Sequence, residues 1–399
     1  MRLFLALLCL IGCAPPLHAG WDWLPWKSST SAEKSASAAP KGASISLTSF
    51  SGSTGSSARR NLHSELLRSG RLAVLRAPDA AGDYTLSASS SSGRIDATLT
   101  SQTKGRLFER TYAAPGLDEN VKTLADDIIY AITGSPGLAT SRIVFVSDQS
   151  GTHQIYMCDP DGRNVHQLTR DPLGAVSPSL SPDATLMAYT SYGGGYSEVR
   201  LLDLGGGFER SITDTSGGAF GAAFAPDGVH LALIMGFLGN PELFITDLNT
   251  TSAACASETL GAPSSPAWHP DGRRLLYSVD EGSGPRLYLA DFGSEKQGGG
   301  LTRWRSGYRY ATDAEWSPDG RQVAFTARSR GSWLVVTREF PSGDARVVRR
   351  NARHPSWSPD GRHLIYAEAG DLCIFDLSKN THRPIITEFG IISEPRWMH

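Results

Sequence analysis

A Ser-Pro-Asp-Gly type of turn recurs from residue 142 onward and constrains the fold more than any other feature of the chain. The turn aspartates of five copies are spaced 44, 44, 48 and 41 residues apart. These aspartates are Asp183, Asp227, Asp271, Asp319 and Asp360. An apolar segment precedes each turn and another follows it, so each unit holds about four short strands in about 40 to 45 residues, which is typical of a β-propeller.

A second pattern sets the number of blades at six. An apolar residue stands four positions before an aspartate in five units, and Leu334 with Arg338 occupies the equivalent place in a sixth. The five pairs are Ile155/Asp159, Val199/Asp203, Leu243/Asp247, Leu287/Asp291 and Leu372/Asp376. The first unit begins at Ile143 with a second strand, whereas Pro395-Arg396-Trp397 matches the inner-strand sequence Pro355-Ser356-Trp357. We therefore expect the C-terminal strand to complete the first blade, because closing the ring removes exposed sheet edges.

The chain divides into four predicted segments. Residues 1–19 are predicted to be an export signal, because Leu3 to Ile11 is an apolar run too short to span about 30 Å of hydrocarbon. Residues 20–42 form a flexible arm rich in Trp, Ser and Ala, since this composition buries little apolar surface. Residues 43–138 form a small α/β domain, and residues 139–399 form the propeller.

Two amphipathic helices among alternating strands indicate the small domain. Ser57 is expected to cap the first helix and Asp118 the second, and a glycine ends each of them, at Gly70 and Gly134. The second helix carries an apolar stripe from Val121 to Ile132 at helical spacing.

Processing of the export signal has two interpretations. Leu17-His18-Ala19 is a small-residue cleavage site before Gly20, whereas Leu10-Ile11-Gly12-Cys13 resembles the box before a lipid-modified cysteine, and soluble export is favoured. Three tryptophans, Trp21, Trp23 and Trp26, follow the cleavage site. They either dock on the chain's own surface or form a short epitope for another protein.

Charge and residue spacing argue against several kinds of site. The 38 Lys and Arg against 40 Asp and Glu give a net charge of -2, which provides no positive field for nucleic acid or an anionic membrane surface. The turn aspartates are predicted to be structural, because Asp, Pro and Gly are turn residues. Asp159 to Asn164 is similar to a calcium loop, but Arg170 stands where that loop needs Glu. No histidines are paired at ligand spacing, so neither a metal nor a cofactor is predicted.

The loops that enter the inner strands are predicted to surround one opening of the propeller, which makes them the candidate partner site. Blades converge toward the axis, and loops on a rigid ring suit recognition. The candidate residues are Ser177, Pro178, Phe220, Ser265, Pro266, Asp313, His354, Pro355, Glu394 and Pro395. Acids and a histidine among apolar rims are typical of an interface rather than a hydrolytic site. Four tryptophans at equivalent inner-strand positions, Trp268, Trp316, Trp357 and Trp397, are instead predicted to pack the blades.

These repeats and the segments around them resemble the TolB family, over about residues 43–399. The resemblance rests on the Trp-Ser-Pro-Asp-Gly inner strands, Ser141-Arg142-Ile143-Val144-Phe145-Val146-Ser147, Ile132-Thr133-Gly134 and Ser69-Gly70-Arg71-Leu72. It implies a small α/β domain packed on a six-bladed propeller, in a non-enzymatic periplasmic adaptor of the Tol-Pal system. The Trp-rich arm and the short stretch from Pro78 to Asp83 depart from the family pattern.

The resemblance also implies protein partners. The peptidoglycan-associated lipoprotein Pal would bind at the propeller mouth, in a system that supports outer-membrane integrity and constriction during cell division. The inner-membrane protein TolA would contact the mature N-terminal segment that holds Trp21, Trp23 and Trp26. No cofactor is implied, and we expect a monomer.

Two other classes stay open. A similar propeller precedes the hydrolase domain of prolyl-oligopeptidase-like peptidases, but the chain contains no Gly-x-Ser-x-Gly motif. A glycan-binding propeller or a metal-dependent lactonase would need polar ligands around the central channel, and the sequence leaves this alternative open.

Overall fold

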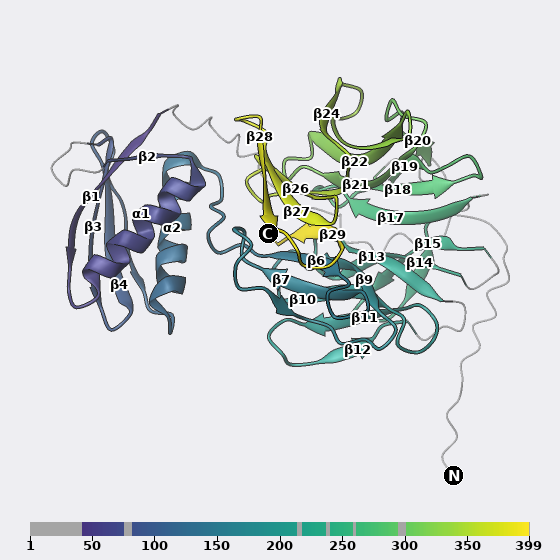
Figure 1. Cartoon of the computed structure of the whole chain (residues 1–399), viewed down its shortest axis with the longest axis horizontal. Coiled ribbons are helices and arrows are strands. Elements are labelled where there is room, and N and C mark those ends of the chain that lie inside the picture. The colour runs from purple at the N-terminus through teal and green to yellow at the C-terminus, as the bar shows by residue number, and fades with distance from the viewer. Residues whose placement is uncertain are drawn as a thin grey trace, which may run out of the picture.

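The computed structural model describes residues 42–75, 82–213, 218–236, 240–257, 261–293 and 301–398. The predicted export signal and the Trp-rich arm up to residue 41 lie outside these residues. Within them the chain forms one five-stranded sheet with two helices, the small domain, and six four-stranded sheets, the propeller (Figure 1). Neither described helix is apolar and long enough to cross a membrane.

The small domain is a mixed sheet covered by two helices. Its strands are β1 (Ser44–Ser51), β2 (Ala73–Leu75), β3 (Tyr84–Ser91), β4 (Arg94–Ser101) and β5 (Gly105–Tyr112), in the order β2-β1-β3-β4-β5. Strand β1 runs parallel to β2 and β3, and the other neighbours are antiparallel. Helices α1 (Gly55–Ser69) and α2 (Leu117–Thr133) bury their apolar faces in one core with the sheet (Figure 1).

The N-terminal ends of both helices differ from the prediction. Ser57 and Asp118 cap neither helix, because each lies inside the first turn of α1 or α2. Thr54 and Gly116 hold the capping positions without a side-chain capping hydrogen bond. The loop before α2 is fixed instead by Asn120, whose side-chain amide bonds the backbone of that loop. Both helices end at a left-handed glycine, as predicted.

Each blade of the propeller is an antiparallel sheet of four strands. The inner strands are β9 (Ala175–Leu180), β13 (Ala219–Phe224), β17 (Ala262–Trp268), β21 (Ala311–Trp316), β25 (Ala352–Trp357) and β29 (Ile392–Trp397). The second strands are β10 (Leu186–Ser191), β14 (His230–Met235), β18 (Arg274–Asp280), β22 (Gln322–Ser329), β26 (His363–Glu368) and β6 (Ile143–Ser147). The third strands are β11 (Glu198–Asp203), β15 (Glu242–Asp247), β19 (Arg286–Asp291), β23 (Ser332–Glu339), β27 (Asp371–Asp376) and β7 (Gln154–Cys158). The outer strands are β12 (Glu209–Ser211), β16 (Ala253–Cys255), β20 (Thr302–Arg303), β24 (Ala345–Arg350), β28 (Thr381–Ile386) and β8 (His166–Gln167).

The inner strands form a closed ring, since each contacts the inner strands of both neighbouring blades. Strand β29 completes the blade that begins with β6, and Trp397 lies opposite Ile143. Turns joining inner to second strands lie at one end of the blades, which we call the turn face. Loops that enter the inner strands, and turns joining second to third strands, lie at the other end, which we call the entry face.

The aspartates of the repeated motif organise the turns, as predicted. In the fifth blade along the chain, the Asp319 carboxylate accepts hydrogen bonds from Ser317 Oγ (2.5 Å) and Arg321 N (3.1 Å). Asp360 accepts the matching bonds from Ser358 Oγ (2.5 Å) and Arg362 N (3.0 Å). The packing prediction for the tryptophans is also confirmed, since Trp316, Trp357 and Trp397 are buried and the half-buried Trp268 packs against a buried apolar cluster.

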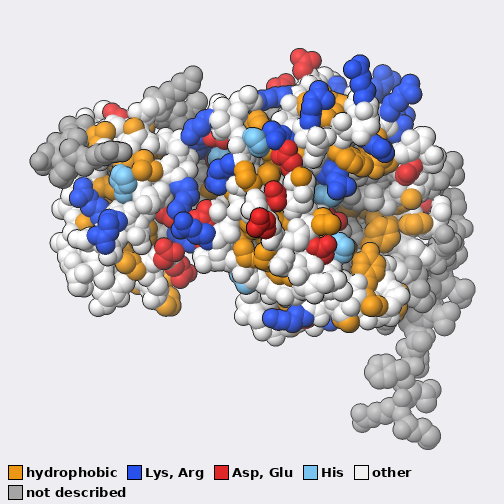
Figure 2. Space-filling model, in the orientation of Figure 1, with side chains coloured by type: hydrophobic (Ala, Val, Ile, Leu, Met, Phe, Trp, Pro, Cys, Tyr) orange, Lys and Arg blue, Asp and Glu red, His pale blue; other side chains and the backbone are white. Residues whose placement is uncertain are grey.

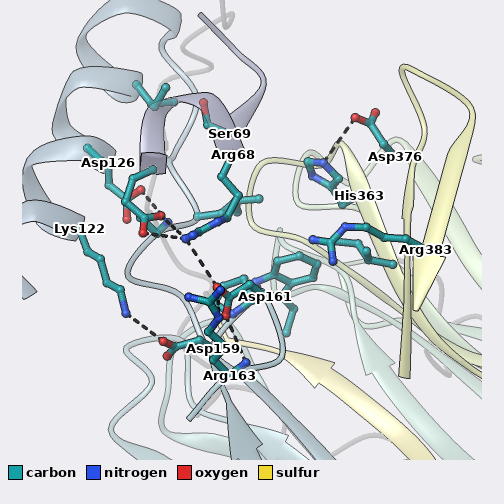
Figure 3. A pocket seen from close by; sticks show the side chains of 18 of the residues that line it. Arg68, Ser69, Lys122, Asp126, Asp159, Asp161, Arg163, His363, Asp376 and Arg383 are labelled. Atoms are coloured by element: carbon teal, nitrogen blue, oxygen red, sulfur yellow. Dashed lines mark hydrogen bonds and ion pairs between the residues drawn. The ribbon is translucent and has the colours of Figure 1, made fainter. Parts of the chain in front are cut away.

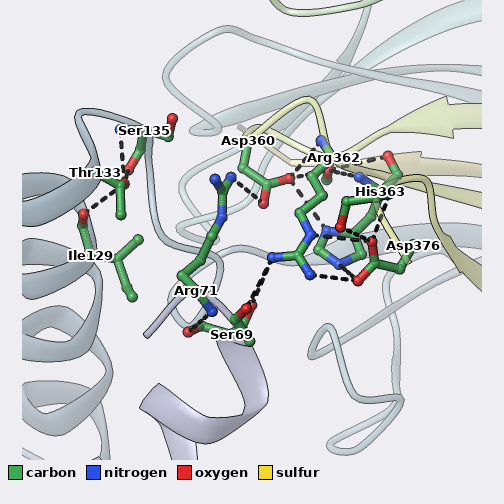
Figure 4. A network of polar contacts seen from close by, with 12 residues as sticks. Ser69, Arg71, Ile129, Thr133, Ser135, Asp360, Arg362, His363 and Asp376 are labelled. Atoms are coloured by element: carbon green, nitrogen blue, oxygen red, sulfur yellow. Dashed lines mark hydrogen bonds and ion pairs between the residues drawn. The ribbon is translucent and has the colours of Figure 1, made fainter. Parts of the chain in front are cut away.

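The small domain meets the turn face through ion pairs whose cations come from the small domain and whose anions come from the propeller. Arg71 Nη2 donates to Asp360 Oδ2 at 2.9 Å, and only 3% of the Asp360 side chain is exposed (Figure 4). Lys122 Nζ lies 2.9 Å from Asp159 Oδ2, and Arg68 Nη1 lies 3.6 Å from an Asp161 oxygen. The turn aspartates Asp159 and Asp360 therefore also anchor the small domain, a role that turn chemistry does not reveal.

Candidate functional site at the propeller mouth

All six inner strands carry the same irregularity near the entry face. Each contains a β-bulge, where two inner-strand residues lie opposite one residue of the second strand. The first bulge residue has a left-handed backbone, with φ between 49° and 64°. These residues are Ser177, Gly221, Ser265, Asp313, His354 and Glu394, which we call the mouth ring. Five of them are not glycine, in a conformation that usually costs L-residues free energy.

The mouth ring differs in three ways from the predicted set of residues. Its members lie inside the inner strands rather than in the loops before them. Gly221 takes the position predicted for Phe220, which is half-buried beside it. Pro178, Pro355 and Pro395 are buried directly after the ring residues, so their side chains are not available to a partner. A bulge adds one residue to the strand, so each side chain after it lies on the face opposite to the one that strict alternation predicts. A count of alternating residues therefore assigns these side chains to the wrong face.

Polar contacts join the ring members of neighbouring blades. Ser265 Oγ donates to Asp313 Oδ1 at 3.1 Å, and Asp313 Oδ2 lies 3.7 Å from His354 Nε2. The Glu394 backbone N–H donates to His354 Nδ1 at 3.3 Å, and Glu394 Oε2 accepts from Ser177 N at 2.6 Å. The links connect every ring position except Gly221, which has no side chain. The ring is therefore an ordered polar rim with one gap.

The order of groups in the rim does not match a hydrolytic triad. Because His354 Nδ1 accepts a backbone N–H, a neutral imidazole carries its proton on Nε2, which faces Asp313. A triad needs the imidazole between the hydroxyl and the carboxylate. Here the Asp313 carboxylate lies between Ser265 and His354. The His354 imidazole is therefore not placed to deprotonate the Ser265 hydroxyl.

Glu315, Ser356 and Arg396, each two residues after a ring position, form a second layer of polar contacts. Glu315 Oε1 accepts hydrogen bonds from Ser356 Oγ (3.0 Å) and Trp357 N (2.8 Å). Arg396 Nη1 lies 3.8 Å from Glu315 Oε2, and Ser356 Oγ accepts from Trp397 N at 3.0 Å. Burial raises the pKa of Glu315, although the Arg396 charge and these two hydrogen bonds oppose the shift. This layer ties the fifth, sixth and first blades together beneath the mouth ring.

The entry face around the ring exposes large apolar side chains. Leu173 precedes β9, Tyr192 and Tyr196 lie in the turn between β10 and β11, and Ile391 precedes β29. Between 39% and 61% of each of these side chains is exposed. The small domain contacts the turn face, at the other end of the blades. Its described part therefore leaves the entry face open. Exposed apolar and aromatic side chains around a polar rim are typical of a protein-binding surface.

A second concave region lies between the small domain and the turn face. Figure 2 shows Lys, Arg, Asp and Glu side chains gathered where the two parts meet, and Figure 3 shows the cavity between them. Its volume is about 420 Å³, and its lining includes Lys122, Asp159, Asp161, Arg163 and Arg383. Lys122 pairs with Asp159 across the junction, and Arg163 lies 3.8 Å from Asp161 within the propeller. Among the described residues, no group of three or more His, Cys, Asp or Glu side chains is placed to hold a metal ion, here or in the mouth ring.

Comparison with known proteins assigns the fold to a family. A family model described as the TolB beta propeller domain matches residues 130–399, which include all six blades. The chain therefore belongs to the TolB β-propeller family. This result confirms the family resemblance and the fold class of a six-bladed propeller after an N-terminal α/β region.

Curated TolB relatives match the chain over short stretches. A protein named Protein TolB homolog from Chlorobium chlorochromatii is 36% identical over 89 residues, which are 21% of this chain and 20% of that protein. The Tol-Pal system protein TolB of Geobacter sulfurreducens is 40% identical over 73 residues, which are 18% of this chain and 17% of that protein. The chain thus matches only about a fifth of the length of these TolB relatives.

A solved TolB structure matches almost the whole chain. TolB from Acinetobacter baumannii superposes with a TM-score of 0.74 and 24% identity, and the match covers 91% of this chain and 98% of that chain. At this identity the likeness shows a shared fold. It extends over the small domain as well as the propeller, because it covers more residues than the TolB propeller model.

A simple sequence signal would have located the mouth ring. Each of the first five ring residues stands six positions before a turn aspartate, as Asp313 does before Asp319 and His354 before Asp360. Glu394 stands three positions before Trp397, as His354 does before Trp357. Counting back from the turn therefore identifies Gly221 instead of Phe220.

Proposed function

We propose that the chain is a non-enzymatic periplasmic adaptor of the Tol-Pal system, which binds the Pal lipoprotein at the entry face of its propeller and supports the outer membrane during division. The observation that carries the proposal is the open entry face, where a polar rim is surrounded by exposed apolar side chains. The curated relatives named as Tol-Pal system proteins support the assignment of the chain to this system. Export of the chain, with soluble or lipid-anchored processing, is part of the same proposal.

The mouth ring gives the first test. We expect His354→Ala and Glu394→Gln to weaken binding of the soluble domain of the same organism's Pal by about fivefold or more, since central polar groups carry much of an interface's energy. Isothermal titration calorimetry measures this affinity. Glu394→Gln keeps the oxygen that accepts from Ser177 N, so the melting temperature should stay near that of the parent. Full-strength Pal binding by both variants would contradict this placement.

The N-terminal segment with Trp21, Trp23 and Trp26 lies outside the described residues, and its contact with TolA is a separate part of the proposal. Deleting residues 20–27 is expected to abolish TolA binding and to change Pal affinity by about fivefold, a coupling of about 1 kcal/mol. Pull-down with purified TolA and calorimetry with Pal measure the two effects. Parent-like binding of both partners by the deletion variant would exclude a docking role for this segment.

A further inference from the structure

The entry face carries a group of arginine and aromatic side chains that lies beside the mouth ring and is not part of it. Trp333 is half-buried at the start of β23, and the guanidinium carbons of Arg328 and Arg353 each lie 5.4 Å from the centroid of its ring. The ring of Tyr310 packs edge-on against Trp333, with centroids 5.3 Å apart and planes at 78°. We call these four residues the Trp333 cluster.

Backbone contacts hold the Trp333 cluster in place. Arg328 lies opposite Trp333 in the ladder between β22 and β23, and its N–H donates to the carbonyl of Tyr310 at 3.2 Å. The Trp333 carbonyl accepts from Asn351 N at 2.7 Å, two residues before Arg353. The cluster therefore joins two blades in a fixed arrangement, and a ligand would not need to order it.

The two guanidinium groups have no anionic partner among the described residues. Arg328 and Arg353 are both exposed and take part in no ion pair there, whereas nearby Arg349 lies 2.7 Å from a Glu368 oxygen. A guanidinium that stacks on an indole keeps its N–H edge available, and that edge matches a carboxylate with two parallel hydrogen bonds. Two such edges flank the same indole.

The charges around the cluster indicate how a ligand would be oriented. Arg353 is adjacent in sequence to His354 of the mouth ring, and the carboxylates of Asp313 and Asp280 act on Tyr310 together with the Arg328 and Arg353 charges. Two cations thus border a rim that contains Asp313 and Glu394. An acidic group would be attracted to the Trp333 cluster and repelled by the rim.

We propose that the Trp333 cluster is a carboxylate-binding site, in which the outward N–H edges of Arg328 and Arg353, stacked on the indole of Trp333, hold an acidic side chain of a protein partner. The assignment rests on the proposed function for the identity of that partner, since Pal is expected to approach the entry face. Trp, Tyr and Arg are the residues in which binding energy concentrates at interfaces. The site would therefore contribute more affinity than the scattered apolar residues around it.

The experiment measures the fluorescence anisotropy of a labelled tetraglutamate peptide, with labelled tetraglutamine as the uncharged control. We expect the parent to bind only tetraglutamate, and Arg328→Ala with Arg353→Ala to weaken this binding by about tenfold or more. Arg353→Lys should lose most of the same affinity, because lysine keeps the charge but not the planar fork. Arg330→Asn is the matched control, since Arg330 is exposed in the same turn, has a left-handed φ of 49° that Asn tolerates, and has no ring contact with Trp333.

The affinity for tetraglutamate tests the carboxylate-binding site. Unchanged binding by the double variant, or an equal loss in Arg330→Asn, overturns it, because the effect would then be absent or would reflect bulk charge. Calorimetry with the soluble domain of Pal decides the proposed function separately, and we expect the double variant to lose about tenfold in Pal affinity as well. A parent protein that binds tetraglutamate but not Pal contradicts the proposed partner and leaves the carboxylate site supported.

Discussion

Asp360→Ala is expected to lower the free energy of unfolding by about 3 kcal/mol, because it leaves the half-buried Arg71 guanidinium without its anion at the domain junction. Arg71 Nη2 and Asp360 Oδ2 are 2.9 Å apart, and 17% and 3% of the two side chains are exposed. Urea unfolding followed by circular dichroism measures the loss.

Asp319→Ala is the matched control for this substitution. Asp319 stands in an identical Ser-Pro-Asp-Gly-Arg turn and accepts the same two turn hydrogen bonds, but it has no ion pair with a described residue. We expect it to cost about 1 kcal/mol, the usual net value of such bonds. Equal losses in the two variants would show that the contact with Arg71 contributes nothing.

The same contact gives a pH dependence. Burial raises the pKa of Asp360, but the hydrogen bond and charge of His363, the hydrogen bond from Ser358 and the Arg71 charge outweigh it, so the pKa lies well below its usual range (Figure 4). A carboxyl whose pKa is lowered on folding stabilises the protein above its unfolded pKa, and this contribution is lost as the pH falls. The stability difference between the parent and Asp360→Asn should therefore be full at neutral pH and shrink below about pH 4.

Trp357→Ala is expected to cost about 3 to 5 kcal/mol, because truncating a buried aromatic residue leaves a cavity between tightly packed blades. Only 1% of Trp357 is exposed, and its Nε1 makes no hydrogen bond to a described residue. The loss is therefore one of packing, and Trp357→Phe should recover most of it. Thermal unfolding by calorimetry measures the series.

Trp268 provides the control at the equivalent position of another blade. Trp268 is half-buried, so Trp268→Ala removes less buried surface and should cost about 2 kcal/mol. A similar loss at both positions would mean that the depth of burial does not set the cost at this strand position.

The propeller could be predicted from sequence because its turn motif recurs at a nearly regular spacing along the chain. Pro, Asp and Gly at regular intervals mark the ends of strands, and the structure places Asp319 and Asp360 in those turns. The helices of the small domain were predicted at their C-terminal ends, where glycine is required for a left-handed backbone. Their N-terminal ends were not, because the backbone at Gly116 begins a helix without a capping side chain.

The site was predictable in part. The candidate site could be predicted to lie near the starts of the inner strands, because these strands must meet at the axis. The bulges were not predicted. A single extra residue determines whether Pro355 or His354 is accessible. Contacts between distant segments were also missed. Arg71 and Asp360 are separated by 289 residues, and Trp333 combines an arginine from its own hairpin with Arg353 from the next blade. Such pairs depend on how blades and domains are placed, which local patterns do not encode.

Completion of the first blade by β29 also has a consequence for biosynthesis. Ile392 of β29 pairs with Ser147 of β6, so this contact joins residues 245 positions apart in the chain. Strand β29 is synthesised after every other described strand, and β6 lacks its inner partner until then. Contacts between such distant residues slow folding, because a long loop must close before the pairing is gained. The folding propeller therefore carries an open sheet edge until β29 has paired with β6, a period in which a holding chaperone would protect it from aggregation.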